Sequence, residues 1–147
     1  RYEHNAGTYY KDMLENAAKY DGMELRQMSK LTQNLLKAVD YDRAKKKREE
    51  NYRILGELLP SESIFNQTVP EGPFAYPYFH ADGMKLRRHL AEKKIFVPTY
   101  WKNIIENSET KSLEYTWVAN ILPCDQRYSV EDMKYMASVV RECEERI

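Results

Sequence analysis

The chain has 147 residues, of which 42% are apolar and 31% charged, and its 23 basic and 23 acidic residues cancel at neutral pH. This length is enough for one domain with a hydrophobic core, and two domains are not expected. The zero net charge disfavours a protein that binds nucleic acid or an anionic membrane through a broad basic field. No apolar run of transmembrane length and no signal peptide is present.

The cysteines and the first residue bear on where the protein works. Cys124 and Cys143 lack the spacing and the histidine partners of a metal site, and a chain of this size needs no disulfide. They indicate a reducing compartment, so we expect a cytoplasmic protein. Because the chain starts at the polar Arg1 and not at a methionine, we expect it to begin within a longer protein or after processing.

The first part of the sequence predicts helices. Apolar residues recur at helical spacing over residues 8–20, a break follows at residues 21–22, and the pattern returns over residues 23–39. Asp40 is placed to cap a further helix over residues 41–59. The apolar stripe of the middle segment consists of Met28, Leu31, Leu35 and Val39. This stripe needs a partner surface, and we expect it to be exposed when the chain is alone.

A cluster of basic residues opens the helix predicted after Asp40. Its members are Arg43, Lys45, Lys46, Lys47 and Arg48. The cluster could bind phosphate or nucleic acid, but Glu49 and Glu50 follow at once and no glycine-rich loop accompanies it. A solvated helix face is therefore the preferred interpretation.

The second part alternates short strands with helices. Loop residues dominate up to Pro73, and residues 74–79 read as an edge strand because Pro77 cannot donate to a ladder. Asp82 is expected to cap a helix that runs to residues 93–94. Its inward-facing side chains are predicted to be Leu86, Leu90 and Ala91. A short buried strand is expected over residues 95–97.

The last elements carry the clearest local signals. A helix is expected over residues 113–120, and the strand around Leu122 should end at Pro123. Ser129 and Asp132 form a capping-box pattern that predicts a helix start at Ser129. The inward stripe of that helix consists of Met133, Met136, Ala137, Val140 and Cys143. Strands separated by helices and preceded by a long helix predict an α+β domain of two layers.

No residue pattern by itself predicts catalysis. His4, His80 and His89 share no metal-like spacing, and His89 is expected at the surface beside two arginines. No serine lies in a glycine-flanked elbow, and neither a phosphate-binding loop nor a dinucleotide fingerprint is present. Core packing and an interface rim explain most of the aromatic residues, and packing is the preferred interpretation of Trp101. Tyr100 and Trp101 follow a strand and Pro98, however, so these residues could line a pocket.

One segment nevertheless resembles a known family. Residues 122–133, with the sequence LPCDQRYSVEDM, are similar to the last strand, turn and helix of DegT/StrS aminotransferases, which use pyridoxal phosphate to aminate sugars. Residues 28–31 (MSKL) resemble the "MSEL" that opens the family's long helix, and residues 47–52 (KREENY) resemble its "RRxxNY" continuation. Residues 74–77 (FAYP) resemble the family's strand in which an aromatic or apolar residue precedes a proline. Residues 90–101 resemble the family's pattern "L…KGI…P…W".

The resemblance implies a fold and a division of the chain. It implies long N-terminal helices packed on a small mixed or antiparallel sheet with helices on one face. Residues 1–22 would be a helical lead-in from a large domain that is missing here, and residues 23–147 would be the C-terminal small domain. It also implies a homodimer that works on nucleotide-linked keto sugars in the synthesis of cell-wall or surface polysaccharides.

The resemblance also implies what this chain lacks. The family binds pyridoxal phosphate as a Schiff base on a lysine of the large domain, and no lysine here lies in that motif, so the chain alone should bind no cofactor. The family places Asn and Arg just before "MSEL", whereas residues 24–27 read ELRQ. Arg26 could still reach a phosphate or carboxylate. Substrate binding is therefore expected from Arg26, Pro98, Tyr100 and Trp101, with no catalytic residue and no metal.

Three interpretations remain at this point. The chain is the C-terminal part of a sugar aminotransferase whose partners are the large cofactor-binding domain, the nucleotide sugar and an amino donor. Alternatively it is a stand-alone, non-catalytic interaction or dimerisation module with the same fold. A nucleic-acid binder that uses residues 43–48 is argued against by the zero net charge and by the acidic residues that follow.

Overall fold

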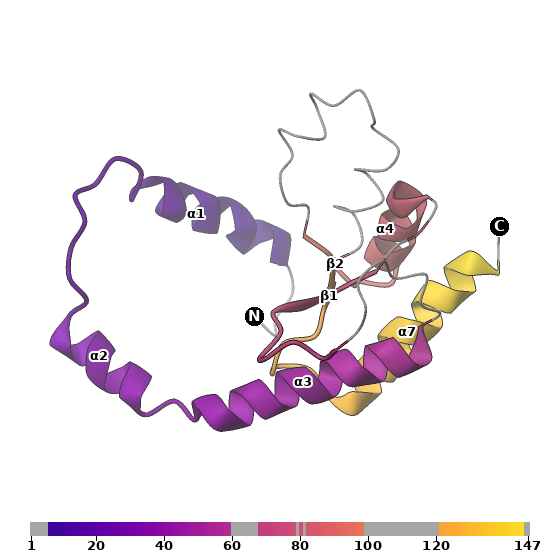
Figure 1. Ribbon diagram of the computed structural model, residues 1–147. Coiled ribbons are helices and arrows are strands. Elements are labelled where there is room, and N and C mark those ends of the chain that lie inside the picture. Colours follow the sequence, from indigo (N-terminus) through magenta and orange to yellow (C-terminus); the bar gives the residue numbers. More distant parts are fainter. Residues whose placement is uncertain (1–5, 60–67, 79, 81, 99–120, 146–147) are drawn as a thin grey trace. The chain divides into compact units, whose positions relative to one another are not determined.

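The computed structural model describes residues 6–59, 68–78, 80, 82–98 and 121–145 (Figure 1). The chain forms two compact units, one of residues 1–39 and one of residues 40–147. Each unit is described by itself. In the described part of the chain the secondary structure comprises five helices and a two-stranded sheet, which makes the protein α+β as the sequence predicts. The helix expected over residues 113–120 lies outside the described residues.

The N-terminal unit contains α1 (Ala6–Ala18) and α2 (Lys30–Lys37). The helical pattern over residues 23–39 predicted a longer second helix, which was wrong for residues 23–29. The reason is a helix start at Ser29, whose hydroxyl accepts the backbone N–H of Thr32 at 3.1 Å. A capping serine has an extended backbone, so the helix cannot continue through it towards the N-terminus.

The apolar stripe of this unit is exposed, as expected. Leu31 and Leu35 are 70% and 63% exposed, and α2 buries no residue. Met28 and Val39 are also exposed. Exposed leucines on one face of a helix are the usual mark of a surface that another element or chain covers.

The C-terminal unit begins with α3 (Tyr41–Leu58), which Asp40 caps as predicted by accepting the N–H of Arg43 at 2.9 Å. The inner face of α3 buries Tyr52 and Leu55. The Tyr52 ring meets that of Tyr76 edge to face, with 4.8 Å between ring centroids, and this geometry suits the opposite charges of ring edge and ring face. The helix therefore anchors one side of the core.

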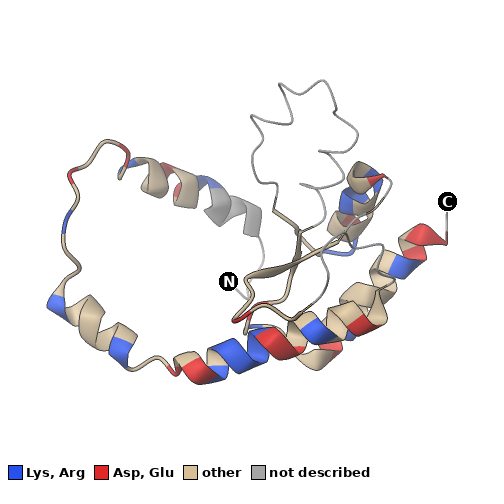
Figure 2. Ribbon diagram, viewed as in Figure 1, with Lys and Arg blue, Asp and Glu red and all other residues tan. Residues whose placement is uncertain are grey.

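The basic cluster on α3 is partly neutralised. Figure 2 shows blue basic and red acidic segments following each other along this helix. Lys45 forms an ion pair with Glu71, and Lys47 with Glu50, with 2.7 Å between the Lys47 Nζ and the carboxylate. The hydrogen bond to Glu71 raises the pKa of Lys45, and the same bond lowers the pKa of Glu71. These contacts support the interpretation of the cluster as a solvated helix face.

The sheet consists of β1 (Ala75–Pro77) and β2 (Ile121–Pro123), paired antiparallel with Tyr76 opposite Leu122. Both of these central side chains are buried, whereas their neighbours in the strands are half-buried. Pairing ends at Pro123, as predicted. Pro77 is the last residue of its strand, where the missing N–H removes no more than a terminal ladder bond.

Two further helices complete the core: α4 (Gly83–Glu92) and α7 (Val130–Glu144). In the C-terminal unit α7 packs against both α3 and α4. All five residues of the stripe predicted for α7 are buried, and Ser129 caps this helix as predicted. In α4, Leu86 and Leu90 are buried as expected, but Ala91 is exposed.

The inward position next to Leu90 is taken by His89, which is 8% exposed. The prediction that His89 lies at the surface was therefore wrong. His89 and Leu90 follow Leu86 by three and four residues, so the three side chains share a helix face. Ala91 follows Leu86 by five residues and therefore lies outside that face. His89 lies between two carboxylates, with 3.9 Å from its Nδ1 to Glu92 and 3.8 Å from its Nε2 to Glu142.

The strand expected over residues 95–97 does not form, and Phe96 is 74% exposed. The end of α4 explains this. The N–H of Ile95 donates to the Leu90 carbonyl at 2.8 Å and the N–H of Lys94 to the Ala91 carbonyl at 2.9 Å. These bonds close the helix in a Schellman-like turn, so the Ile95 N–H is not available to a strand.

Lys94 occupies the left-handed position of this turn, with φ of 62°. This backbone conformation costs a residue with a Cβ about 1 kcal/mol relative to glycine. We therefore expect Lys94→Gly to raise the free energy of unfolding by about 1 kcal/mol, measured by urea denaturation. Lys93→Gly, one residue earlier and at negative φ, should instead lower it. Equal effects from the two substitutions would contradict the left-handed position assigned to Lys94.

Candidate functional site at the junction of α3 and the turn before α7

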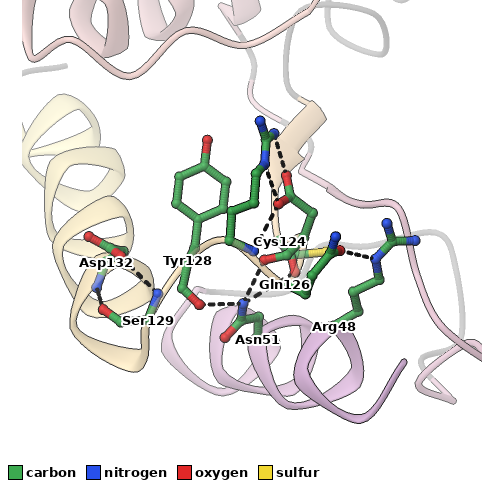
Figure 3. A network of polar contacts seen from close by, with 9 residues as sticks. Arg48, Asn51, Cys124, Gln126, Tyr128, Ser129 and Asp132 are labelled. Atoms are coloured by element: carbon green, nitrogen blue, oxygen red, sulfur yellow. Dashed lines mark hydrogen bonds and ion pairs between the residues drawn. The ribbon is translucent and has the colours of Figure 1, made fainter. Parts of the chain in front are cut away.

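Asn51 ties α3 to the turn that joins β2 to α7 (Figure 3). This side chain is completely buried, and its Nδ2 donates to the carbonyl oxygens of Cys124, Asp125 and Tyr128 at 3.3, 3.0 and 3.1 Å. The three partners are all acceptors, so the amide nitrogen must face them. Asn51 thus supplies a donor to three carbonyl groups of the turn, of which that of Asp125 also accepts the Tyr128 N–H at 3.2 Å.

The turn itself is held by Asp125. Its Oδ1 accepts the backbone N–H of Arg127 at 3.0 Å, and its two oxygens accept the Arg127 guanidinium at 2.7 and 2.8 Å. The guanidinium hydrogen bonds lower the pKa of the Asp125 carboxyl and raise that of Arg127. The same guanidinium lies 5.7 Å from the centre of the Tyr128 ring. These contacts fix the turn in one conformation.

Ser129 and Asp132 then start α7 with a complete capping box. The Ser129 hydroxyl accepts the Asp132 N–H at 3.1 Å, and the Asp132 carboxylate accepts the Ser129 N–H at 2.7 Å. On the other side of the turn, the Arg48 side chain donates to Gln126 at 2.7 Å. Polar groups from α3, the turn and α7 therefore form one continuous network.

We expect the protonation of Asp125 at low pH to lower the free energy of unfolding. The depressed pKa of Asp125 gives stability that is present above the unfolded carboxyl pKa of about 3.9 and is lost as the pH falls through the folded pKa. Asp125→Asn should therefore cost about 1–2 kcal/mol at pH 7, a range discounted because Arg127 is half exposed. Denaturant unfolding of both proteins at several pH values measures this difference.

The difference in free energy of unfolding between wild type and Asp125→Asn should become smaller below about pH 4. Glu24→Gln, which removes an exposed carboxylate of the N-terminal unit, is the control and should change stability little at any of these pH values. A gap for Asp125→Asn that is the same at neutral and acid pH would contradict the role assigned to its charge.

Cys124 contributes packing to this junction and no nucleophile. Its side chain is completely buried. This burial, together with the smaller effect of the nearby Asp125 carboxylate, raises the pKa of the thiol to about 12. At neutral pH the group is therefore a thiol and not the reactive thiolate. The contacts at the junction hold the backbone of the turn against α3. None of the side chains described here is arranged to transfer a proton or to attack a substrate.

Both cysteines should consequently resist thiol reagents in the folded protein. Cys143 is 2% exposed and, like Cys124, carries a reduced thiol. We expect a disulfide-exchange reagent to modify neither thiol within minutes under native conditions and both on addition of denaturant. Titration of released chromophore with and without denaturant measures this. Rapid modification of either cysteine in the native protein would contradict the burial described here.

The substrate-binding residues predicted from the sequence are only partly described. Arg26 is exposed in the segment between α1 and α2, and Pro98 is exposed after α4. Tyr100 and Trp101 lie outside the described residues. Arg26 belongs to the N-terminal unit and Pro98 to the C-terminal unit.

Sequence reasoning singled out no role for Asn51, Asp125 or Arg127. A polar residue on the apolar face of a helix, next to Tyr52 and one turn before Leu55, was the available signal for Asn51. For the turn, Asp two residues before Arg is a weak pattern, because many surface loops contain it.

Comparisons with protein-family models, curated proteins and solved structures gave no match. Within the described residues, no group of His, Cys, Asp and Glu side chains is arranged to hold a metal ion. None of the described helices has both the length and the apolar character that crossing a membrane requires.

Proposed function

We propose that the chain is the C-terminal small domain of a pyridoxal-phosphate-dependent aminotransferase of the DegT/StrS type. The complete enzyme would transfer an amino group to a nucleotide-linked keto sugar in the cytoplasm, for surface polysaccharide synthesis. This chain would not be catalytic alone. Its partners would be the large cofactor-binding domain and a second subunit.

The contact between two resembling segments supports this proposal most. Residues 47–52 and 122–133 are far apart in sequence, and each resembles the family by itself. Asn51 of the first segment donates to the Cys124, Asp125 and Tyr128 carbonyls of the second. A chance likeness in two separate strings gives no reason for the two segments to meet in the folded chain. A shared fold does give such a reason.

In this proposal the Schiff base of the cofactor forms on a lysine of the large domain. Every described lysine is at least partly exposed, whereas a Schiff-base lysine is activated by a desolvated pocket or a neighbouring cation. The cofactor would supply an electron sink for the amino transfer, held by the large domain. This chain would contribute Arg26, Pro98, Tyr100 and Trp101 to the substrate cleft, and the junction around Asn51 would hold the small domain rigid.

The experiment compares the chain with a longer protein. We expect pyridoxal phosphate mixed with this chain to give no aldimine absorbance and no single borohydride-reducible lysine adduct by mass spectrometry. We also expect the coding sequence upstream of Arg1 to contain a large domain with the Schiff-base lysine, and the longer protein to show both signals. A specific adduct on this chain, or an upstream sequence without such a domain, would overturn the proposal.

A second candidate function is a non-catalytic dimerisation module. The exposed stripe on α2, with Leu31 and Leu35 more than half exposed, favours it. Sedimentation at several concentrations measures whether the chain associates with itself. Leu35→Glu should abolish any such association. A monomer at all concentrations would exclude the dimerisation module while leaving the aminotransferase proposal intact.

A further inference from the structure

A cleft of about 280 Å³ lies between the end of α4 and the first turns of α7 in the C-terminal unit. Its lining includes Lys93, Lys94 and Phe96 from one side and Asp132 and Tyr135 from the other. The lining also includes Tyr128, whose carbonyl accepts from Asn51, and Asp132 caps α7. The cleft therefore adjoins the Asn51 junction.

Among the residues that the structure describes, one cation of the cleft has no ion-pair partner. Lys93 lies 3.4 Å from Glu142, and the Asp132 carboxylate accepts the Ser129 N–H at 2.7 Å. Lys94 forms no ion pair with any residue that the structure describes. Lys94 can pair with a single negative charge of a ligand, whereas the Asp132 carboxylate in the same lining repels a ligand that carries further negative charges.

The aromatic side chains give the cleft a flat apolar surface. Phe96 is 74% exposed and Tyr135 is 52% exposed, although rings of this size usually bury most of their area. Both line the same cleft as Lys94. A ligand with a ring of its own would remove both rings from water.

The volume limits the size of that ligand. A cavity of roughly 150 Å³ is enough for benzene, whereas drug-sized ligands occupy roughly 300–1,000 Å³. At about 280 Å³, the cleft has room for one ring with a short charged substituent. A nucleotide, with its larger volume and its phosphate charges, is disfavoured by both size and charge.

We propose that this cleft binds a small aromatic monoanion, such as an aromatic carboxylate, with its ring against Phe96 and Tyr135 and its charge on Lys94. The proposal is independent of the function proposed above, because it rests only on the cleft of this chain. Phenylacetate is a suitable probe. For a ligand of this size at an open cleft, we expect a dissociation constant on the order of 1 mM.

The experiment is a titration of the isotope-labelled chain followed by NMR. We expect phenylacetate to shift the amide signals of Lys94, Phe96 and Tyr135 in a saturable way. Phenylacetamide, which lacks the charge, and cyclohexylacetate, which lacks the aromatic ring, should each bind at least about fivefold more weakly. Equal binding of either analogue would overturn the stated ligand class, and an absence of saturable shifts at the cleft would overturn the site.

Substitutions then test the residues. Lys94→Gly removes the charge and relieves the left-handed backbone, so it should stay folded and weaken phenylacetate binding about tenfold. Phe96→Ala, at an exposed position, should weaken it about fivefold. Lys134→Ala removes an exposed cation of α7 outside the cleft and should bind as the wild type does. Wild-type affinity in Lys94→Gly, or a matching loss in Lys134→Ala, would refute the role of Lys94.

Discussion

Replacing Asn51 with leucine is expected to destabilise the C-terminal unit by about 3 kcal/mol. Leucine is close to asparagine in size, so the change leaves little cavity, but it removes the donor shared by the Cys124, Asp125 and Tyr128 carbonyls. The Asp125 carbonyl keeps the Tyr128 N–H as a donor. A buried acceptor left without a donor costs about 1–3 kcal/mol, and relaxation of the turn recovers part of that cost. Urea unfolding followed by circular dichroism measures the difference.

The matched control for this change is Arg48→Ala, three residues earlier on the same helix. Arg48 donates to Gln126 at 2.7 Å at an exposed site, so its loss should cost less than about 1 kcal/mol. Asn51→Asp provides a second variant, because it would face the three carbonyl oxygens with a carboxylate and should be at least as damaging as leucine. A cost for Asn51→Leu no greater than that of Arg48→Ala would contradict the junction described here.

Leu122→Ala should cost a similar amount, about 3–4 kcal/mol, for a different reason. Leu122 is completely buried and stands opposite Tyr76, which is 1% exposed, at the centre of the sheet. Truncation there removes apolar contact and leaves a cavity that strands of three residues cannot close. Thermal or urea unfolding measures the loss.

The neighbouring Ile121→Ala is the control for Leu122→Ala. Ile121 lies on the same strand with its side chain on the alternate face, where it is only half-buried. Its truncation should cost less than half as much. Comparable losses at the two positions would show that the alternation of buried and half-buried residues does not govern stability in this sheet.

The features that the sequence predicted correctly depend on neighbouring residues. Asp40, Asp82 and Ser129 cap their helices because each accepts an N–H three residues further along the chain. The stripe of α7 follows from helical periodicity alone. The α+β class follows from the order of the elements. Such signals are local, so one sequence is enough to recognise them.

The features that were missed depend on contacts across the fold or on an unusual residue. A run such as Ile95–Val97 is ambiguous between strand and loop, and lysine at the left-handed position hides the helix end that a glycine would have signalled. The burial of His89 and Asn51 depends on α7 and on the turn before it, which lie more than 40 residues further along the chain. Of the predicted substrate residues, Tyr100 and Trp101 lie outside the described part, so their role stays a prediction.

The packing of α3 on α7 also has a consequence for synthesis on the ribosome. The inner face of α3, with Tyr52 and Leu55, is covered by a helix that begins only at Val130. At roughly 5–20 residues per second, α7 emerges on the order of ten seconds after α3. During that interval the nascent chain presents an unshielded apolar helix face. A chaperone that binds short apolar segments should therefore bind chains that are truncated before Val130 and released from the ribosome, and should not bind released chains that contain α7.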